Sequence, residues 1–220
     1  MNQQLKEFAQ KVTDRIKLVS DKDRVGEQGL NQFDWSNEVF YSFNLFRRAH
    51  VEVLDKIESN GMWILHCTIF PHFDDDSPIF GLDIVATDKK VSAVFHDFSP
   101  TINQNHHLCK WFKEKMKTSF IASNRELPEW GKEIFSTDML AIRTIKEDET
   151  IKWLLDFMFS NLDYYLLNIG ASGMEIQDYQ NRYCANQKKN PYPVMMLTKF
   201  GLTEDKAKQF IDKHLFPESL

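Results

Sequence analysis

The sequence predicts a single α/β domain over residues 1–220, built as a three-layer α/β/α sandwich around a central, mainly antiparallel sheet. Apolar residues recur at three- and four-residue intervals towards both ends of the chain, which is typical of amphipathic helices. In the middle of the chain they alternate with polar residues at a period of two, which is typical of half-buried strands. Helices on both sides of one run of strands pack most simply as covers on the two faces of a sheet.

The first half of the chain supplies one helix and then the strands. An amphipathic helix is expected at the start, with an apolar face of Leu5, Phe8, Val12, Ile16 and Val19. After a polar stretch at residues 21–32, short alternating runs extend from about residue 38 to residue 98. Turn-forming sequences interrupt these runs at SNG 59–61, DDDSP 74–78 and TDKK 87–90. We therefore expect a meandering antiparallel sheet in this region.

The second half returns to helical spacing. We expect helices at residues 105–121 and 147–169, with a further strand at residues 135–145 between them. Shorter helices follow at residues 173–188, 193–200 and 203–215. We find no internal repeat and no linker-like tract in the sequence, so one undivided domain is predicted.

Composition places the chain among ordinary globular proteins. Of 220 residues, 42% are hydrophobic and 27% are charged, which is richer in core-forming residues than a disordered chain. No apolar run approaches the ~20 residues that span a bilayer, and the first residues lack the basic and then apolar pattern of a signal peptide. We therefore expect a cytoplasmic protein without a membrane partner.

Charge and cysteine content argue against a nucleic-acid-binding protein, a disulfide-stabilised protein and an iron–sulfur protein. The 27 basic and 32 acidic side chains give a formal net charge of −5, so there is no global basic field and we expect no nucleic-acid partner. The 3 cysteines, Cys67, Cys109 and Cys184, lie far apart and outside any CxxC spacing. Their number and spacing argue against a disulfide framework and against a four-cysteine iron–sulfur cluster, and predict reduced thiols.

The signatures of common cofactor and hydrolase sites are missing from the sequence. It contains no GxGxxG that opens a helix after a strand, no GxxxxGK[ST], no GxSxG and no HExxH. If the protein is an enzyme, its chemistry depends on another arrangement of side chains.

Four titratable residues stand out because they lie inside strand-like segments. His50 occurs in RRAHVEV, His66 in MWILHCTIF and Asp83 in PIFGLDIVA. Residues two apart on a strand share a face, so His50 and Glu52 project to the same side of the sheet. A charge in such apolar runs is costly unless it is paired or protonated. Carboxyl and imidazole groups gathered in a cavity shift one another's pKa values towards neutrality, which suits general acid catalysis.

Each of these features also has a purely structural interpretation. A single histidine on a strand is most often a satisfied core residue, and a single aspartate most often faces water. The acidic run 74–76 near His72 lacks the alternating oxygen ligands of a calcium loop, which favours a solvated turn over a metal site. Lysines gather near the C-terminus, as Lys188, Lys189, Lys199, Lys206 and Lys208. They form either a solvated face or a surface for anionic ligands or an acidic protein.

Several long motifs stand in order along nearly the whole chain. They are FRRAHVEV at 46–53, WILHCTIFP at 63–71, PIFGLDIVA at 78–86, VSAVFHDFSP at 91–100, ELPEWGKEIFS at 126–136, IR at 142–143 and KFG at 199–201. Together they resemble the ferredoxin-dependent bilin reductases. The resemblance implies an oxidoreductase that reduces biliverdin IXα to a phycobilin through bilin radicals, with single electrons from external reduced ferredoxin. It implies no metal and no cofactor bound by the enzyme itself.

The resemblance also implies roles for individual residues. Asp83 is the expected central proton donor, and His66 and His50 are expected to hold and relay protons near the terminal lactams. Glu52 is expected to deliver a proton towards the D-ring vinyl group. One-electron reduction makes a conjugated bilin more basic, so the placement of such acids decides which carbon is protonated.

Substrate contacts are implied in the same way. Arg143, in the IR pair, matches the family's arginine for a propionate, which a planar guanidinium can bind through two hydrogen bonds; a surface ion pair is the alternative. Ser92 is also expected to contact the substrate. Asn190 stands where the family usually has a catalytic aspartate, and an amide cannot act as an acid. The product is therefore left open between phycocyanobilin and phycoerythrobilin.

We thus expect a monomeric bilin reductase that holds biliverdin between the sheet and the C-terminal helices. Ferredoxin, which is acidic, is expected to dock at a basic patch by the pocket mouth. Two other classes stay open. A non-catalytic tetrapyrrole-binding or carrier protein of the same fold would bind biliverdin without consuming electrons. A metal-dependent hydrolase would use His50, Glu52 and His66 and would retain tightly bound metal.

Overall fold

The computed structural model describes residues 1–21, 33–119, 121–170 and 172–219. The strands form one 6-stranded sheet in the order β1-β2-β3-β4-β5-β6, and every neighbouring pair is antiparallel. They span Ser36–Phe40 (β1), Arg48–Lys56 (β2), Met62–Phe70 (β3), Ile79–Ala86 (β4), Val91–Ser99 (β5) and Leu140–Ile145 (β6). The predicted meander is confirmed, and the strand predicted at residues 135–145 forms in the second half of that range.

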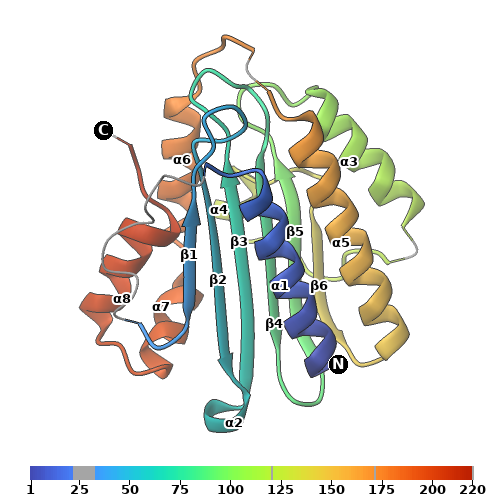
Figure 1. The fold of residues 1–220 in the computed structure, drawn as a ribbon, viewed down its shortest axis with the longest axis vertical. Coiled ribbons are helices and arrows are strands. Elements are labelled where there is room, and N and C mark those ends of the chain that lie inside the picture. Colours follow the sequence, from blue (N-terminus) through green and yellow to red (C-terminus); the bar gives the residue numbers. More distant parts are fainter. Residues whose placement is uncertain (22–32, 120, 171, 220) are drawn as a thin grey trace.

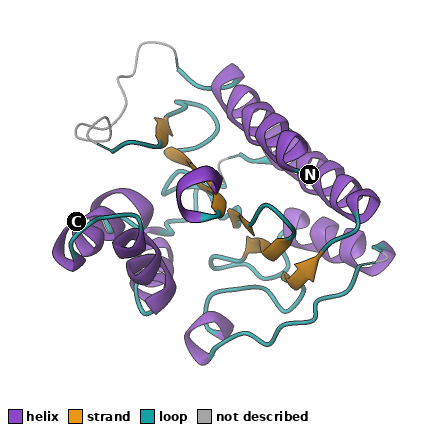
Figure 2. Cartoon of the chain, turned by 90° about the horizontal axis from the view of Figure 1, so that it is seen from below, coloured by secondary structure: helices purple, strands orange, loops and turns teal. Residues whose placement is uncertain are grey.

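The helices lie in two groups, one on each face of the sheet (Figure 1). The first group comprises α1 (Asn2–Leu18), α3 (His107–Thr118) and α5 (Asp148–Asn168). The second comprises α4 (Glu129–Lys132), α6 (Gln177–Gln187), α7 (Pro191–Lys199), α8 (Glu204–Phe210) and the π-helix η2 (Ile211–Leu215). A short helix, α2 (Ile57–Asn60), connects β2 to β3. Figure 2 shows the strands between the two groups, so the three-layer α/β/α sandwich is confirmed.

The two faces of the sheet differ because side chains alternate along each strand. One face carries the main apolar core, in which Leu65, Leu82 and Val94 pack under the first group of helices. The predicted apolar face of α1 is buried in this core. The opposite face is polar at its centre, and a second apolar cluster that includes Phe70 and Phe210 packs beside this polar centre. The second group of helices therefore covers a face that is only partly apolar.

The loop between β3 and β4 corrects one prediction. The acidic run 74–76 is solvated only in part, because Asp74 is exposed in a turn whereas Asp75 and Asp76 are only 1% and 5% exposed. The backbone N–H of Ser77 donates to Asp75 Oδ1 at 2.9 Å, and Asn103 Nδ2 donates to Asp76 Oδ2 at 3.2 Å. Hydrogen bonds of this kind offset the cost of burying a carboxyl group. The sequence did not reveal the hydrogen bond from Asn103, because that residue comes from a distant segment.

Other sequence predictions meet the structure as follows. Helix α4 was not predicted, because one turn is too short to show a period. The predicted polar stretch at 21–32 lies, apart from Asp21, outside the described residues. Cys67, Cys109 and Cys184 are free, as predicted. Among the described helices, none has both the length and the apolar character that a bilayer span requires.

Candidate active site

A cavity of about 500 Å³ lies between the polar face of the sheet and the second group of helices. The sheet contributes Glu52, Leu54, Ile64, His66, Asp83, Val85, Ala93 and Phe95. The segment before β6 contributes Arg125, Leu127, Pro128, Trp130, Phe135 and Met139. The C-terminal part contributes Gln187, Asn190, Pro191, Tyr192, Pro193, Met196, Leu197, Leu215 and Phe216. A mostly apolar and aromatic lining with a few polar groups is typical of a site for a small organic ligand.

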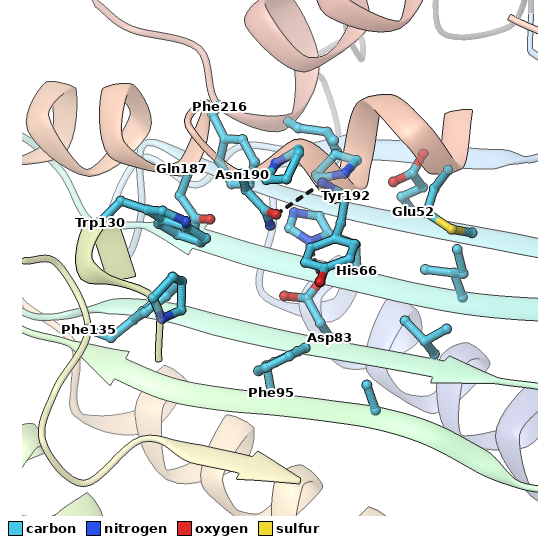
Figure 3. Close-up of a pocket in the computed structure, with 18 of the residues that line it drawn as sticks. Glu52, His66, Asp83, Phe95, Trp130, Phe135, Gln187, Asn190, Tyr192 and Phe216 are labelled. Atoms are coloured by element: carbon cyan, nitrogen blue, oxygen red, sulfur yellow. Dashed lines mark hydrogen bonds and ion pairs between the residues drawn. The ribbon is translucent and has the colours of Figure 1, made fainter. Parts of the chain in front are cut away.

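The titratable residues of the cavity form one row across the sheet. The strand register pairs Glu52 with His66 and His66 with Asp83, and the row continues to Phe95. Side chains at directly paired positions lie on the same face and in contact range. Strands β2, β3 and β4 therefore each deliver one acid–base group to the same cavity, as Figure 3 shows.

His66 and Asp83 form the closest pair in this row. His66 Nδ1 donates to Asp83 Oδ1 at 2.5 Å, and Thr68 Oγ1 lies 2.9 Å from His66 Nε2. Burial by itself would lower the pKa of His66, but the charge and hydrogen bond of Asp83 and the charge of Glu52 raise it above its ordinary value. The pair can therefore hold a proton at the cavity surface under neutral conditions.

Glu52 lies at the other end of the row and is only 4% exposed. Trp35 Nε1 donates to Glu52 Oε1 at 2.8 Å. Burial raises the pKa of Glu52 to about 7, although the charge of His66 and the hydrogen bond from Trp35 oppose this shift. A carboxyl group with such a pKa is present in both protonation states near neutral pH, so it can give or take a proton.

His50 lies beside the row and is not among the residues that line the cavity. Its side chain is fully buried, with its ring centroid 5.9 Å from that of His66. His50 Nε2 donates to Asn37 Oδ1 at 3.2 Å, and Nδ1 has no hydrogen-bond partner among the described residues. Burial, together with the charges of Arg48, His66 and His214, holds the pKa of His50 well below its ordinary value. The ring is therefore neutral, and it lies next to the lining residue His66 without lining the cavity itself.

Ser92 and Arg143, expected to contact the substrate, are not among the lining residues. Ser92 lies beside the register shift between β4 and β5. Arg143 is exposed on the edge strand β6, opposite Ala93, which lines the cavity. Arg143 is therefore on the correct face of the sheet but at its rim.

Asn190 does line the cavity, and it also caps a helix. Its Oδ1 accepts a hydrogen bond from the backbone N–H of Tyr192 at 3.1 Å, at the N-terminus of α7 (Figure 3). With Oδ1 engaged in this way, the Nδ2 group remains to donate to a ligand.

Arg125 is a cavity residue that the sequence interpretation missed. It is the only lysine or arginine among the described lining residues. Its guanidinium carbon lies 4.7 Å from the ring centroid of Phe95 and 5.7 Å from that of Tyr192. These rings hold a planar cation at the cavity wall. The sequence feature that could have indicated Arg125 is its position directly before the ELPEWGKEIFS motif.

Aromatic walls are the other feature that sequence patterns did not locate. Trp130 and Phe135 lie on one side of the cavity in Figure 3, with ring centroids 6.0 Å apart. The rings of Phe216 and His66 meet in a T-shaped contact, with centroids 5.7 Å apart. Flat rings on several sides of the cavity suit a flat conjugated ligand.

A metal-dependent hydrolase would need metal ligands in the cavity. Within the part of the chain that the structure describes, no group of three His, Cys, Asp or Glu side chains is arranged to hold a metal ion. The set His50, Glu52 and His66 is also divided, because His50 does not line the cavity.

Related proteins share both the sequence and the fold. The model of a family described as ferredoxin-dependent bilin reductase matches residues 21–217. A phycocyanobilin:ferredoxin oxidoreductase from Prochlorococcus marinus (strain MIT 9515) is 30% identical over 189 residues, which cover 80% of this chain and 75% of that protein. One from Synechococcus sp. (strain CC9605) is 32% identical over 194 residues, which cover 82% of this chain and 74% of that protein.

Two solved structures are also similar. The solved structure of PcyX matches with a TM-score of 0.72 and 25% identity, over 98% of this chain and 99% of that chain. Phytochromobilin synthase from tomato, solved in complex with biliverdin, matches with a TM-score of 0.76 and 18% identity, over 96% of this chain and 82% of that chain. The second likeness concerns the fold alone.

Proposed function

This chain belongs to the ferredoxin-dependent bilin reductase family and is an oxidoreductase, and from this premise we propose that it reduces biliverdin IXα to a phycobilin. The observation that carries the proposal is the row Glu52, His66 and Asp83 on the floor of an apolar cavity with aromatic walls. Biliverdin is a flat conjugated tetrapyrrole, so it needs such walls for its rings and polar groups for its nitrogens and lactam ends.

In the proposed reaction, each electron from reduced ferredoxin enters the bound pigment and is followed by one proton from the cavity floor. Addition of an electron makes the bilin more basic, so the nearest positioned acid decides where the proton goes. His66 and Asp83 would supply protons at the centre of the pigment, and Glu52 would supply one at its end. Donors at separate fixed positions would direct protons to separate carbons. The regiochemistry, phycocyanobilin or phycoerythrobilin, would then depend on which donor acts at each step.

The propionate groups of biliverdin require cations, and the cavity offers one at Arg125. A guanidinium can bind a carboxylate through two parallel hydrogen bonds. Arg143 lies at the rim of the same face and would contact a propionate only if that group extended to the sheet edge. Asn190 Nδ2 would donate to a pigment oxygen from the opposite wall.

Ferredoxin, the electron donor of this family, would dock near the mouth of the cavity on the lysine-rich C-terminal part. Some of these lysines already have partners, because Lys188 lies 2.7 Å from Glu218 and Lys208 lies 2.5 Å from Glu204. Lys199 and Lys206 have no carboxylate partner among the described residues and are the better candidates for contacts with an acidic protein.

Anaerobic incubation with biliverdin, reduced ferredoxin and a system that regenerates it tests the proposal. We expect the pigment to be converted, with ferredoxin oxidised in proportion, and the product to be identified by chromatography. Recovery of unchanged biliverdin from a coloured complex, with no ferredoxin oxidised, would instead identify a tetrapyrrole carrier.

A further inference from the structure

Trp35 makes a contact that the proposed reaction does not itself require. It directly precedes β1, and its indole N–H donates to Glu52 Oε1 on β2 at 2.8 Å. An indole N–H can only donate a hydrogen bond. The carbonyl oxygen of a carboxylic acid is a better acceptor than its hydroxyl oxygen. Oε1 therefore remains the acceptor when Glu52 is protonated, and the proton belongs on Oε2.

The indole ring is itself held in a fixed position. Its centroid lies 4.8 Å from that of Phe33 and 5.9 Å from that of Phe210, which meets it edge-on. Phe33 and Phe210 also contact each other, with centroids 4.7 Å apart. Phe210 is the last residue of α8, so the indole ring is held between the segment that enters β1 and the second group of helices. Packing of this kind makes the N–H a donor of fixed direction.

Glu52 has no second anchor of this kind. Among the described residues, no hydrogen bond reaches its Oε2, and the carboxyl group lies at the cavity lining. The facing position on β1 is Asn37, and that on β3 is His66. Without Trp35, the carboxyl group could rotate and present either oxygen to a ligand.

We propose that Trp35 is the positioning residue of Glu52: it fixes the orientation of the carboxyl group and confines its acid proton to Oε2. The inference rests on the proposed function for the use of that proton, since only a reductase would pass it to the pigment. The effect of Trp35 on the orientation and protonation of the Glu52 carboxyl group is already present in the ligand-free protein. It can therefore be measured without biliverdin or ferredoxin.

The experiment compares Trp35→Phe with a matched control, Trp63→Phe. Phenylalanine keeps an aromatic ring between Phe33 and Phe210 but has no N–H. Trp63 is buried in the main apolar core on the opposite face, and its Nε1 has no hydrogen-bond partner among the described residues. Both variants lose the same atoms, but only one loses a bond to Glu52. Both variants leave the neighbouring charged and titratable groups unchanged, namely His50, His66, Asp83, Arg48 and His214.

The readout is the infrared carbonyl stretch of protonated Glu52, followed over pH and identified by its disappearance in Glu52→Gln. A hydrogen bond to a charged carboxylate is stronger than one to its neutral form, so its removal should raise the midpoint of the titration by about one pH unit. The stretch should also move to higher frequency in Trp35→Phe, because the C=O group loses its donor. Trp63→Phe should have the same titration midpoint and the same stretch frequency as the wild type.

Two results would overturn the proposal. One is an unchanged midpoint and stretch frequency in Trp35→Phe. The other is an equal shift in Trp63→Phe, which would reflect general loosening of the sheet. If the shift is found and yet biliverdin is not reduced, the positioning role holds and the proposed function fails. If biliverdin is reduced and no shift is found, the proposed function holds and the positioning role fails.

Discussion

Asp83 and His66 face each other across the β3–β4 ladder, with Asp83 Oδ1 2.5 Å from His66 Nδ1. The charge on the imidazole therefore depends on a carboxylate that lies in the same cavity. This coupling is the reason that a buried histidine here has a raised pKa, whereas burial lowers the pKa of its neighbour His50. A change at Asp83 should thus affect two proton donors at once.

We expect Asp83→Asn to bind biliverdin but to stop after the first electron. The amide has nearly the same size and keeps an acceptor oxygen for His66, but it removes the negative charge that raises the pKa of His66 and cannot itself act as an acid, so protonation of the reduced pigment is lost. Electron paramagnetic resonance and absorption spectra under anaerobic conditions should show a long-lived bilin radical. Asp88→Asn, in the exposed turn after β4, is the matched control and should turn over normally. Normal product from Asp83→Asn would refute the role of Asp83.

We expect Glu52→Gln to stabilise the protein at high pH only. The pKa of Glu52 rises from 4.5 to about 7 on folding, so between these values the folded state binds a proton that the unfolded state has lost. Stability from this group is therefore present below its unfolded pKa and is lost as the pH rises to about 7. The full cost of the buried charge is on the order of 3 kcal/mol. The glutamine side chain of the variant retains an acceptor for Trp35 without this cost.

Urea unfolding over a series of pH values measures this difference. The variant and the wild type should have similar free energies of unfolding near pH 4, and the variant should be more stable by about 1–3 kcal/mol near pH 8.5. A stability difference that does not change with pH would contradict the buried-carboxyl explanation.

Arg125→Ala should weaken binding of biliverdin more than Arg143→Ala does. Loss of a charge-assisted hydrogen bond in the cavity raises the dissociation constant by roughly 10- to 100-fold, whereas loss of an exposed rim cation changes it by about 3-fold or less. Absorption titrations with biliverdin give both constants. Biliverdin with esterified propionates is the control, because its affinity should differ little between Arg125→Ala and the wild type. An equal loss of affinity for biliverdin and for its ester would argue against a propionate contact.

Asn190→Asp should change the proportions of the phycobilin products. The substitution retains the cap of α7 and adds an ionisable group at the cavity wall. Asn190→Ser also retains a cap but adds no acid, so it should leave the proportions unchanged. Chromatography of the extracted pigments decides the matter, and identical chromatograms for Asn190→Asp and the wild type would show that this position does not direct protonation.

Turnover with ferredoxin should fall as salt is added. At an ionic strength of 0.1 M, exposed charges are screened beyond ~10 Å, which weakens the docking of an acidic protein on lysines. Combined replacement of Lys199 and Lys206 by alanine should raise the KM for ferredoxin and flatten the salt dependence. Alanine at Lys188, which already pairs with Asp212 and Glu218, should have a smaller effect. Turnover that is independent of salt would exclude docking through a basic patch.

The sheet and the floor of the cavity were predictable because both follow from a two-residue period. A strand with one polar and one apolar face shows its alternation in the sequence, and His50, Glu52, His66 and Asp83 could be assigned to strands on that basis. The structure places all four on the same face. The meeting of Glu52, His66 and Asp83 in one cavity depended on the register between strands, which periodicity alone does not fix.

The walls of the cavity were not predictable from pattern. Arg125 comes from an irregular segment and Trp130 from the single-turn helix α4, and the place of both at the cavity depends on how this part of the chain packs against distant helices. The same holds for the bond between Trp35 and Glu52, which joins residues 17 positions apart. Ser92 and Arg143 were assigned by family resemblance, and a local register shift and an edge strand separate them from the lining.

Because Glu52, His66 and Asp83 each stand on a different strand, each can be exchanged without a change in the backbone pairing that holds the others in place, although a change at Asp83 also alters the pKa of His66. A point mutation replaces one proton donor without moving the other two, so a new product can evolve in single steps. An insertion or deletion inside β2, β3 or β4 has the opposite effect, since a slip of one residue turns a strand's functional side chain to the other face. Protein engineers should therefore vary residues at these positions and keep the lengths of the strands unchanged.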